Sequence, residues 1–386
     1  MCLASFSSLA SMRACDPLLP MLADEFGTTT GAAAQTIAAF TLAYGVTQFL
    51  YGPLSDRLGR TRVMAFACLA CALANLAVAA AHSLGAATAA RVLAGAASGG
   101  IVPISLALIG DAVAYERRQE TLARLMLATN LGMMAGQWLG GMLADAVGWR
   151  AVFIVLSAGF AAVSLPLFGD ARRRRAAALQ APAATRPPGG ALAGFAAVLQ
   201  DRWARWILVI TLLEGAFVFS SMAFVPSFLH DTFGLSPGQA GAVMALYAGA
   251  GLVYTPLARH VIRRLGERGQ ALVGACTIAV GTALLAASPA WGWAVPACLL
   301  TGLGFFMLHS TLQTHATQMA PERRATGVSL FVVCLFTGQA AGVALAALAV
   351  DHASPRWVFA LTALAMPLIG LAFRHGLATR APKHGA

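Results

Sequence analysis

The chain has 386 residues, of which 59% are hydrophobic and 11% are charged, and its formal net charge is +11. Apolar runs of about 20 residues can cross a hydrocarbon core of roughly 30 Å as helices, so this composition excludes an ordinary soluble domain and predicts an all-α membrane protein. The positive charge requires no nucleic-acid partner, because basic residues collect on the cytoplasmic face of membrane proteins beside anionic lipids.

Apolar runs between charged or turn-forming residues predict twelve transmembrane helices. The predicted spans are 2–22, 33–54, 63–82, 86–110, 121–144, 150–169, 205–229, 237–258, 270–288, 293–319, 326–350 and 357–374. The first of them begins almost at Met1 with no basic segment before it, so we expect a retained span rather than a cleaved signal peptide.

One long polar connection separates six spans from the other six. It contains four consecutive arginines at 172–175, followed by proline and glycine, and a solvated linker is its simplest interpretation. The predicted organisation is a six-helix bundle at 1–169, a basic cytoplasmic linker at 170–204, a second six-helix bundle at 205–374 and a cytoplasmic tail at 375–386.

Short sequences recur between the two halves at offsets of 202 to 207 residues. The pairs are DEFG at 24–27 with DTFG at 231–234, YGPLS at 51–55 with YTPLA at 254–258, ERR at 116–118 and 322–324, GQ at 136 and 338, and AVF at 151–153 with WVF at 357–359. Matches in chain order at nearly constant spacing predict two pseudo-symmetric parallel repeats, an architecture whose substrate site lies between the halves.

The connections between spans alternate in charge. One set carries arginine clusters, whereas the other carries Asp24, Glu25, Asp145, Asp231 and Asp351. Because arginine-rich short loops stay in the cytoplasm, we predict a multi-pass protein of the cell inner membrane with both termini cytoplasmic.

The sequence GPLSDRLGR at 52–60 resembles the loop between helices 2 and 3 of the major facilitator superfamily. The matching positions are Gly52, Asp56, Arg57, Gly59 and Arg60. The resemblance covers the whole chain and implies that these residues form a cytoplasmic gate, with Asp56 near the start of helix 11 at Thr326. An acid there stabilises closure through the positive helix N-terminus, and Gly52 permits close backbone approach. The alternative is that the loop charges only set topology.

Further motifs are similar to the drug:proton antiporter branch of that family. They are DPLLP at 16–20, RVLAGAASGG at 91–100 and GQWLGG at 136–141. The implied helix-packing positions are Gly95, Gly136, Gln137, Gly140 and Gly141. Gln137 replaces the proline of the branch, which counts against antiport. Arg259 follows YTPLA where Asp56 follows YGPLS, so we expect the gate to be asymmetric.

Ionisable residues well inside the predicted spans mark the candidate substrate cavity, because each is costly unless it faces protein or water. They are Arg13, Asp16, Arg91, Glu214 and His309, on the helices that line the central cavity in the family fold. Arg13 and Asp16 share a helix face and can pair, so this cluster is either a structural ion pair or a substrate-binding network. His309 is either a cavity residue or a hydrogen-bonded packing residue.

Two acids are candidates for proton coupling. Arginines near Asp16 favour its ionised form, whereas Glu214 has no basic residue within one helical turn, and an unpaired carboxyl in an apolar environment loads a proton readily. We therefore expect Glu214 to carry the proton and Asp16 to belong to the substrate-side network. The alternative for Glu214 is a neutral acid hydrogen-bonded to a neighbouring helix.

The resulting prediction is a monomeric secondary transporter that exports a small drug-like molecule in exchange for protons, with the lipid bilayer as its other partner. The alternative is a transporter of a polar metabolite such as a sugar or organic anion. The sequence contains no HExxH, GxSxG or GxxxxGK[ST] motif, so neither an enzyme nor ATP-driven transport is expected, and neither is a cofactor. Histidine and cysteine spacing predicts no metal site.

The predicted topology can be tested by cysteine labelling in a background that lacks the native cysteines. Because loop charge sets orientation, cysteines at Arg172 and Arg323 should be shielded from an impermeant thiol reagent in intact cells, while one at Asp231 should react. The opposite pattern would overturn the orientation.

Overall fold

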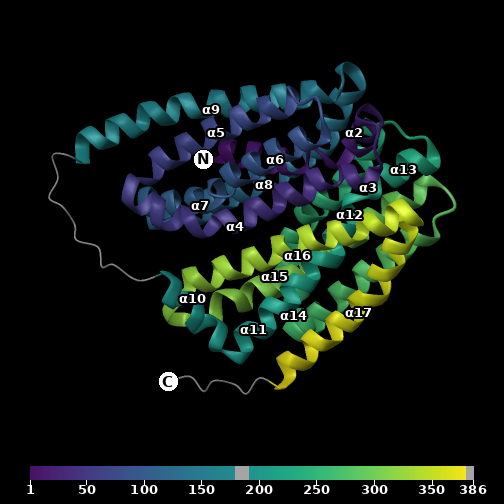
Figure 1. Ribbon diagram of the computed structural model, residues 1–386. Coiled ribbons are helices and arrows are strands. Elements are labelled where there is room, and N and C mark those ends of the chain that lie inside the picture. Colours follow the sequence, from purple (N-terminus) through teal and green to yellow (C-terminus); the bar gives the residue numbers. More distant parts are fainter. Residues whose placement is uncertain (179–190, 380–386) are drawn as a thin grey trace. The chain divides into compact units, whose positions relative to one another are not determined.

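The computed structural model describes residues 1–178 and 191–379, and its regular elements there are helices (Figure 1). The chain divides into two compact units. Unit 1 comprises Met1–Leu192 and Leu235–Ala242, and unit 2 comprises Ala193–Gly234 and Val243–Ala386.

Unit 1 contains the first ten helical segments of the chain together with the beginning of α14. They are α1 (Cys2–Arg13), η1 (Asp16–Leu18), α2 (Leu19–Phe26), α3 (Thr30–Ala33), α4 (Gln35–Leu58), α5 (Arg60–Ala79), α6 (Leu84–Ser98), α7 (Ile101–Ala112), α8 (Tyr115–Val147) and α9 (Trp149–Ala178). Pro17 lies where the first predicted span is interrupted, since proline lacks the amide donor that a continuous helix needs.

Unit 2 contains the remaining segments. They are α10 (Ala191–Gln200), α11 (Arg202–Glu214), the π-helical η2 (Gly215–Phe219), α12 (Ser220–Ala223), α13 (Val225–Phe233), α14 (Pro237–Ala287), η3 (Trp291–Trp293), α15 (Ala294–Gln318), η4 (Pro321–Arg323), α16 (Arg324–His352) and α17 (Pro355–Thr379). Gly266, with φ of 64°, breaks α14 between the predicted spans 237–258 and 270–288. A positive φ is accessible to glycine at little cost.

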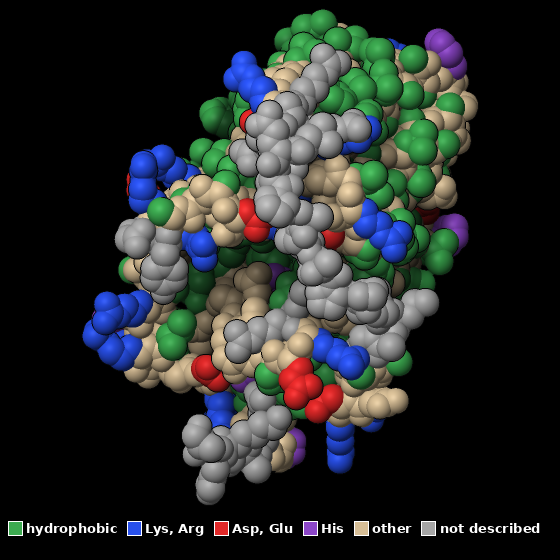
Figure 2. Space-filling model, turned by 90° about the vertical axis from the view of Figure 1, so that its left-hand side faces the viewer, with side chains coloured by type: hydrophobic (Ala, Val, Ile, Leu, Met, Phe, Trp, Pro, Cys, Tyr) green, Lys and Arg blue, Asp and Glu red, His purple; other side chains and the backbone are tan. Residues whose placement is uncertain are grey.

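Eight helical stretches among the described residues are long and apolar enough to cross a membrane, and the one at Pro237–Ala287 holds two predicted spans. The other predicted spans coincide with α1 to α2, with α4 and with α8. Large apolar side chains stay exposed on the helices, including Leu165, Leu345 and Leu364, and hydrophobic groups gather in the upper part of the face shown in Figure 2. Such surface suits contact with lipid chains.

The predicted basic linker at 170–204 is helical on both sides of its centre. α9 continues to Ala178 and α10 covers Ala191–Gln200, while residues 179–190, which include part of this prediction, lie outside the described residues. α17 ends at Thr379, so residues 380–386 of the predicted tail also lie outside them. The boundaries at 169, 204 and 374 stay predictions.

Glycines let α8 lie directly on the backbone of α1. A Cβ at Gly132 would overlap the carbonyl oxygen of Phe6, and a Cβ at Gly136 would overlap that of Ala10. Small residues at helix contacts allow the close approach on which packing between membrane helices depends.

The same contact recurs in unit 2 between α16 and the α11–η2 segment. A Cβ at Gly338 would overlap the carbonyl oxygen of Leu212, and one at Gly342 would overlap that of Ala216. Each of these four residues lies 206 positions after its counterpart in unit 1. The packing therefore repeats along with the sequence.

This geometry corrects one of the five sequence pairings. The GQ at 136 and the GQ at 338 are offset by 202 residues, whereas the packing pairs Gly136 with Gly342. The ERR and AVF/WVF matches have the offset of 206 that the helix contacts show. The recurring GQ is thus one helical turn out of register.

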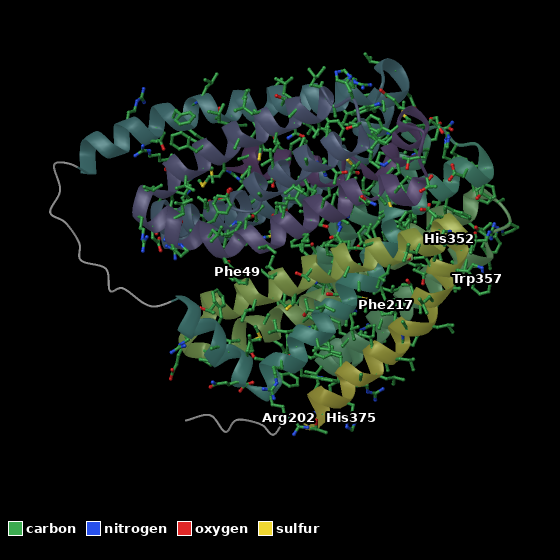
Figure 3. All side chains as sticks on the ribbon, viewed as in Figure 1. Phe49, Arg202, Phe217, His352, Trp357 and His375 are labelled. Atoms are coloured by element: carbon green, nitrogen blue, oxygen red, sulfur yellow. The ribbon has the colours of Figure 1, made fainter. Side chains whose placement is uncertain are left out.

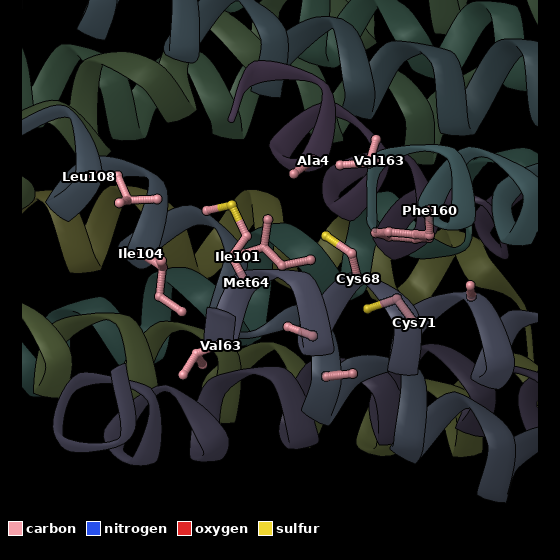
Figure 4. Packing of buried hydrophobic residues seen from close by; sticks show 13 residues of the cluster. Ala4, Val63, Met64, Cys68, Cys71, Ile101, Ile104, Leu108, Phe160 and Val163 are labelled. Atoms are coloured by element: carbon pink, nitrogen blue, oxygen red, sulfur yellow. The ribbon is translucent and has the colours of Figure 1, made fainter. Parts of the chain in front are cut away.

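Cys68 and Cys71, the CxxC of the sequence, are free thiols in a buried apolar cluster of unit 1. Figure 4 shows them among Met64, Ile101 and Phe160. Their surroundings are those of small packing residues, because apolar side chains from several helices enclose them.

The close contact between α8 and α1 predicts different effects for two neighbouring glycines. Gly136→Ala should lower stability by about 1–3 kcal/mol because the new methyl overlaps Ala10. Gly140→Ala is the control, since its nearest neighbours would be at ordinary contact distances of 3.7 to 3.9 Å. Thermal unfolding in detergent measures both, and equal melting temperatures for the two variants would contradict the packing argument.

Candidate functional site

A polar stripe runs along α1 inside unit 1. Ser5, Ser8 and Ser11 are buried, and successive members at i, i+3 spacing share one helix face. The hydroxyl of Ser5 donates to Ser105 at 3.2 Å, that of Ser8 shares a hydrogen bond with Ser98 at 2.7 Å, and that of Ser11 donates to Asn75 at 3.1 Å. The sequence analysis did not identify this stripe, although the serine spacing was a visible signal.

The stripe leads to a buried acid. Asp16 is 0% exposed, and its Oδ2 lies 3.8 Å from Nη1 of Arg13. The side-chain amide of Gln137 donates to the same oxygen at 3.4 Å. Gln137, which stands where the antiporter branch has a proline, therefore contacts Asp16. The sequence analysis did not assign this role to Gln137.

Arg91 lies in the same unit but is held by other groups. Its Nη1 donates to the carbonyl of Ser11 at 2.9 Å and its Nε to that of Thr36 at 3.5 Å. The guanidinium carbon lies 4.0 Å from the ring centre of Phe40, close enough for a cation–π contact. Arg91 thus connects α6 to α1 and α4, while the ion pair of Asp16 is made with Arg13.

Glu214 and His309 meet inside unit 2. Glu214 is 0% exposed, and its Oε2 lies 2.9 Å from Nδ1 of His309, whose side chain is 18% exposed. The imidazole stacks on Phe305 with ring centres 4.9 Å apart. The sequence analysis found no basic residue near Glu214 along its own helix. The structure brings His309 to it from α15.

The backbone next to Glu214 is also unusual. Glu214 ends α11, and the π-helical η2 follows at once. Single π-helical turns occur frequently at functional sites. A Cβ at Gly215 would overlap the carbonyl oxygen of Leu335 on α16, so a glycine allows α16 to pack directly beside the acid.

Several buried polar atoms of unit 2 have no hydrogen-bond partner among the described residues. They include Oε1 of Glu214, Oγ of Ser221 and both ends of the Gln339 side chain, on elements that pack against α16 or belong to it. Such groups call for an additional partner, because an unmet buried donor or acceptor is costly. In the sequence, the position of Gln339 within an apolar run was the signal that could have identified these polar groups.

The predicted gate residues lie at the turn between α4 and α5. Gly59 ends α4 with φ of 89°, a conformation that favours glycine. Arg60 lies 3.5 Å from Asp56, forms an ion pair with Asp111 of α7, and donates to the carbonyl of Ala107 at 2.9 Å. Asp111 is a partner that the sequence analysis missed.

Two other gate residues are exposed. A Cβ at Gly52 would meet nothing within 4 Å, and the close backbone approach expected at this glycine stays a prediction. Arg57 is also exposed. The action of Asp56 on the helix N-terminus near Thr326, in the first turn of α16, stays a prediction.

The remaining packing motif residues lie on two helix contacts. A Cβ at Gly95 of α6 would overlap the carbonyl oxygen of Phe40 on α4. On α8, a Cβ at Gly141 would overlap the carbonyl oxygen of Pro237. The same end of α8 carries Asp145, whose Oδ2 accepts from the backbone amide of Gly238 at 2.9 Å, so the first turn of α14 is fixed to α8 within unit 1.

Comparison with known proteins agrees with this architecture. A family model described as Major Facilitator Superfamily matches residues 1–342. A chloramphenicol resistance protein of Streptomyces lividans is 29% identical over 384 residues, covering 95% of this chain and 93% of that protein. A multidrug resistance protein B homolog of Mycobacterium tuberculosis is 27% identical, covering 83% of this chain and 69% of that protein.

Solved structures match over nearly the full chain. A crystal structure of a mutant of the nucleoside transporter NupG has a TM-score of 0.78 at 14% identity and covers 97% of this chain and 98% of its own. A bacterial homolog of the lysosomal transporter Spinster has a TM-score of 0.74 at 17% identity and covers 98% and 95%. At these identities the likeness shows the fold alone.

The contacts of Arg91 predict that its shape matters as well as its charge. Arg91→Lys should lower stability by about 1–3 kcal/mol, because an ammonium lacks the planar fork that reaches two carbonyls while stacking on Phe40. Arg263→Lys, at an exposed position of α14, is the matched control and should change the melting temperature by no more than about 1 °C. Equal stability of the two variants would show that only the charge at residue 91 is needed.

Proposed function

The chain belongs to the major facilitator superfamily of secondary transporters, and we propose that it exports a small organic molecule in exchange for protons by alternating access. The family assignment makes it a multi-pass membrane protein with a small-molecule substrate rather than an enzyme. We propose in addition that the exchanged ion is a proton, that transport is outward and that the substrate is a drug-like molecule.

The observation that carries proton exchange is the buried pair of Glu214 and His309. Their 2.9 Å contact lets one proton reside on either group. A proton taken up from water at the partly exposed imidazole can pass along this hydrogen bond and neutralise the carboxylate. Loss of that proton leaves a buried charge whose cost depends on the surroundings of Glu214, so a conformational change that alters those surroundings is coupled to protonation.

Export of a drug-like molecule is supported by the names of the relatives, which include chloramphenicol and multidrug resistance proteins. A cluster of aromatic rings, buried in this structure, lies beside the pair. Phe305, on which His309 stacks, has its ring centre 5.2 Å from that of Phe219 and 5.7 Å from that of Tyr247. Flat apolar molecules bind well against aromatic rings.

We assign Asp16, Arg13 and Gln137 to the substrate-side network of unit 1. Asp16 is buried and has a cationic partner at 3.8 Å. Its Oδ1 has no hydrogen-bond partner among the described residues, which leaves an acceptor for a substrate donor. Asp16 is therefore proposed to bind substrate, and Glu214 to carry the proton.

The inner end is proposed to close through the α4–α5 turn, with both termini cytoplasmic and the monomer as the working unit. Arg60 holds Asp56 and Asp111 near each other, so two carboxylates share one guanidinium at this turn. The shared guanidinium holds the carboxylate of Asp56 at the turn between α4 and α5.

Proton coupling is tested by drug-induced proton release from the purified protein. Glu214→Gln mimics the protonated acid, so release should fall below about a tenth of the wild-type value while substrate affinity stays within about threefold. Asp16→Asn should keep proton release per bound substrate but weaken binding about tenfold, as expected for loss of one charged hydrogen bond.

Glu267→Gln is a matched control, because Glu267 also contacts a histidine, His315 at 3.2 Å, but is 56% exposed. It should release protons as the wild type does. Persistent release in Glu214→Gln with loss of release in Asp16→Asn would reverse the two assignments.

A further inference from the structure

We propose that unit 2 carries a binding site for a phospholipid with an anionic headgroup, in a cavity between α11 and α17. The cavity has a volume of about 870 Å³ and is open to the surroundings. It is lined by Arg202, Trp203, Arg205, Trp206, Val209, His375, Gly376 and Thr379. None of its lining residues is assigned to transport.

The mouth of the cavity is basic. Arg202 and Arg205 come from the first turn of α11, and Figure 3 shows Arg202 beside His375 at the end of α17. Arg268 adds a further cation, since its Nη2 donates to the carbonyl of Leu377 next to the lining residue Gly376. The nearest acid in sequence, Asp201, accepts the amide of Ala204 at 2.8 Å and so caps α11.

One donor in this cavity is available to a ligand, and a second one is buried in the cavity wall. Arg202 is exposed and makes no hydrogen bond or ion pair with the described residues, whereas Arg205 donates to the carbonyls of Leu199 and Gln200. The Nε1 of Trp206 is buried and has no hydrogen-bond partner among the described residues. Because a Cβ at residue 376 would overlap this nitrogen, Gly376 leaves room for the indole at the cavity wall.

Apolar surface continues from the basic mouth along both helices. On α11, Val209 lines the cavity and is 49% exposed, one turn after Arg205. On α17, Leu364, Leu368 and Leu371 are 71%, 67% and 50% exposed, and their spacing places them on the helix face that leads to His375. Acyl chains can therefore follow exposed leucines while the headgroup occupies the cavity.

This combination distinguishes a lipid from other occupants. A soluble phosphate would use the cations but not the leucine face, and an ordinary belt of interfacial tryptophans would need no cavity. Basic pockets between membrane helices suit acidic headgroups, and basic residues at the surface of an anionic leaflet each add attraction. The exposed guanidinium of Arg202 matches phosphate oxygens.

The test uses the full-length purified protein, stripped of lipid in detergent and titrated with phosphatidylglycerol or phosphatidylcholine, with bound lipid counted by native mass spectrometry. Wild type should bind phosphatidylglycerol at least about tenfold more tightly than phosphatidylcholine. Arg202→Glu should abolish that preference. Arg263→Glu, the same charge reversal at an exposed arginine of α14 that lines no part of this cavity, should keep it within about threefold.

Trp206→Phe retains the ring and removes only an N–H that is buried against Gly376, so phosphatidylglycerol binding should stay within about threefold of the wild type. A large excess of inorganic phosphate should leave the bound lipid in place. Displacement by phosphate would identify a soluble-anion site, and equal losses in Arg202→Glu and Arg263→Glu would indicate general surface charge. Either result, or an unchanged preference in Arg202→Glu, would overturn the proposal.

Discussion

Every polar group inside a membrane helix must find its partner within the protein, because hydrocarbon offers no hydrogen bonds and a buried unpaired charge costs several kcal/mol. This constraint explains the arrangement of α1. Its serines pair with polar side chains of α5, α6 and α7, and the stripe ends at the ion pair of Arg13 and Asp16. A helix with this polar face has to lie inside its bundle.

Polar contacts of this kind require helices that approach closely, and glycine supplies the approach. Gly136 rests on the backbone of Ala10, and Gly342 on that of Ala216. The two contacts are equivalent by the repeat, so the same small-residue packing brings α8 to α1 and α16 to the segment that carries Glu214. The same helix packing is therefore found in both units.

The ionisable side chains are not repeated at equivalent positions of the two units. The position 206 residues after Asp16 is Met222, and the position 206 residues before Glu214 is Ser8. One unit therefore has an acid held by an arginine and a glutamine, and the other has an acid held by a histidine. Duplicated helices can diverge in this manner because packing depends on small residues at a few contacts, while the polar positions between them are free to change. A transporter that handles a substrate and a coupling ion can use such a division.

The sequence by itself determined the family, the membrane spans, the two repeats and the shortlist of buried ionisable residues. It could do so because hydrophobic length and intramembrane charge are local properties, and because the loop motif at 52–60 is specific. Only the tertiary structure decided which side chains meet. His309 reaches Glu214 from 95 positions away, Gln137 reaches Asp16 from 121, and Asp111 reaches Arg60 from 51. Spacing along one helix predicts the pair of Arg13 and Asp16. Contacts between helices depend on how each helix is rotated and shifted against its neighbour. The close glycine contacts fix that rotation and register only when the bundle packs.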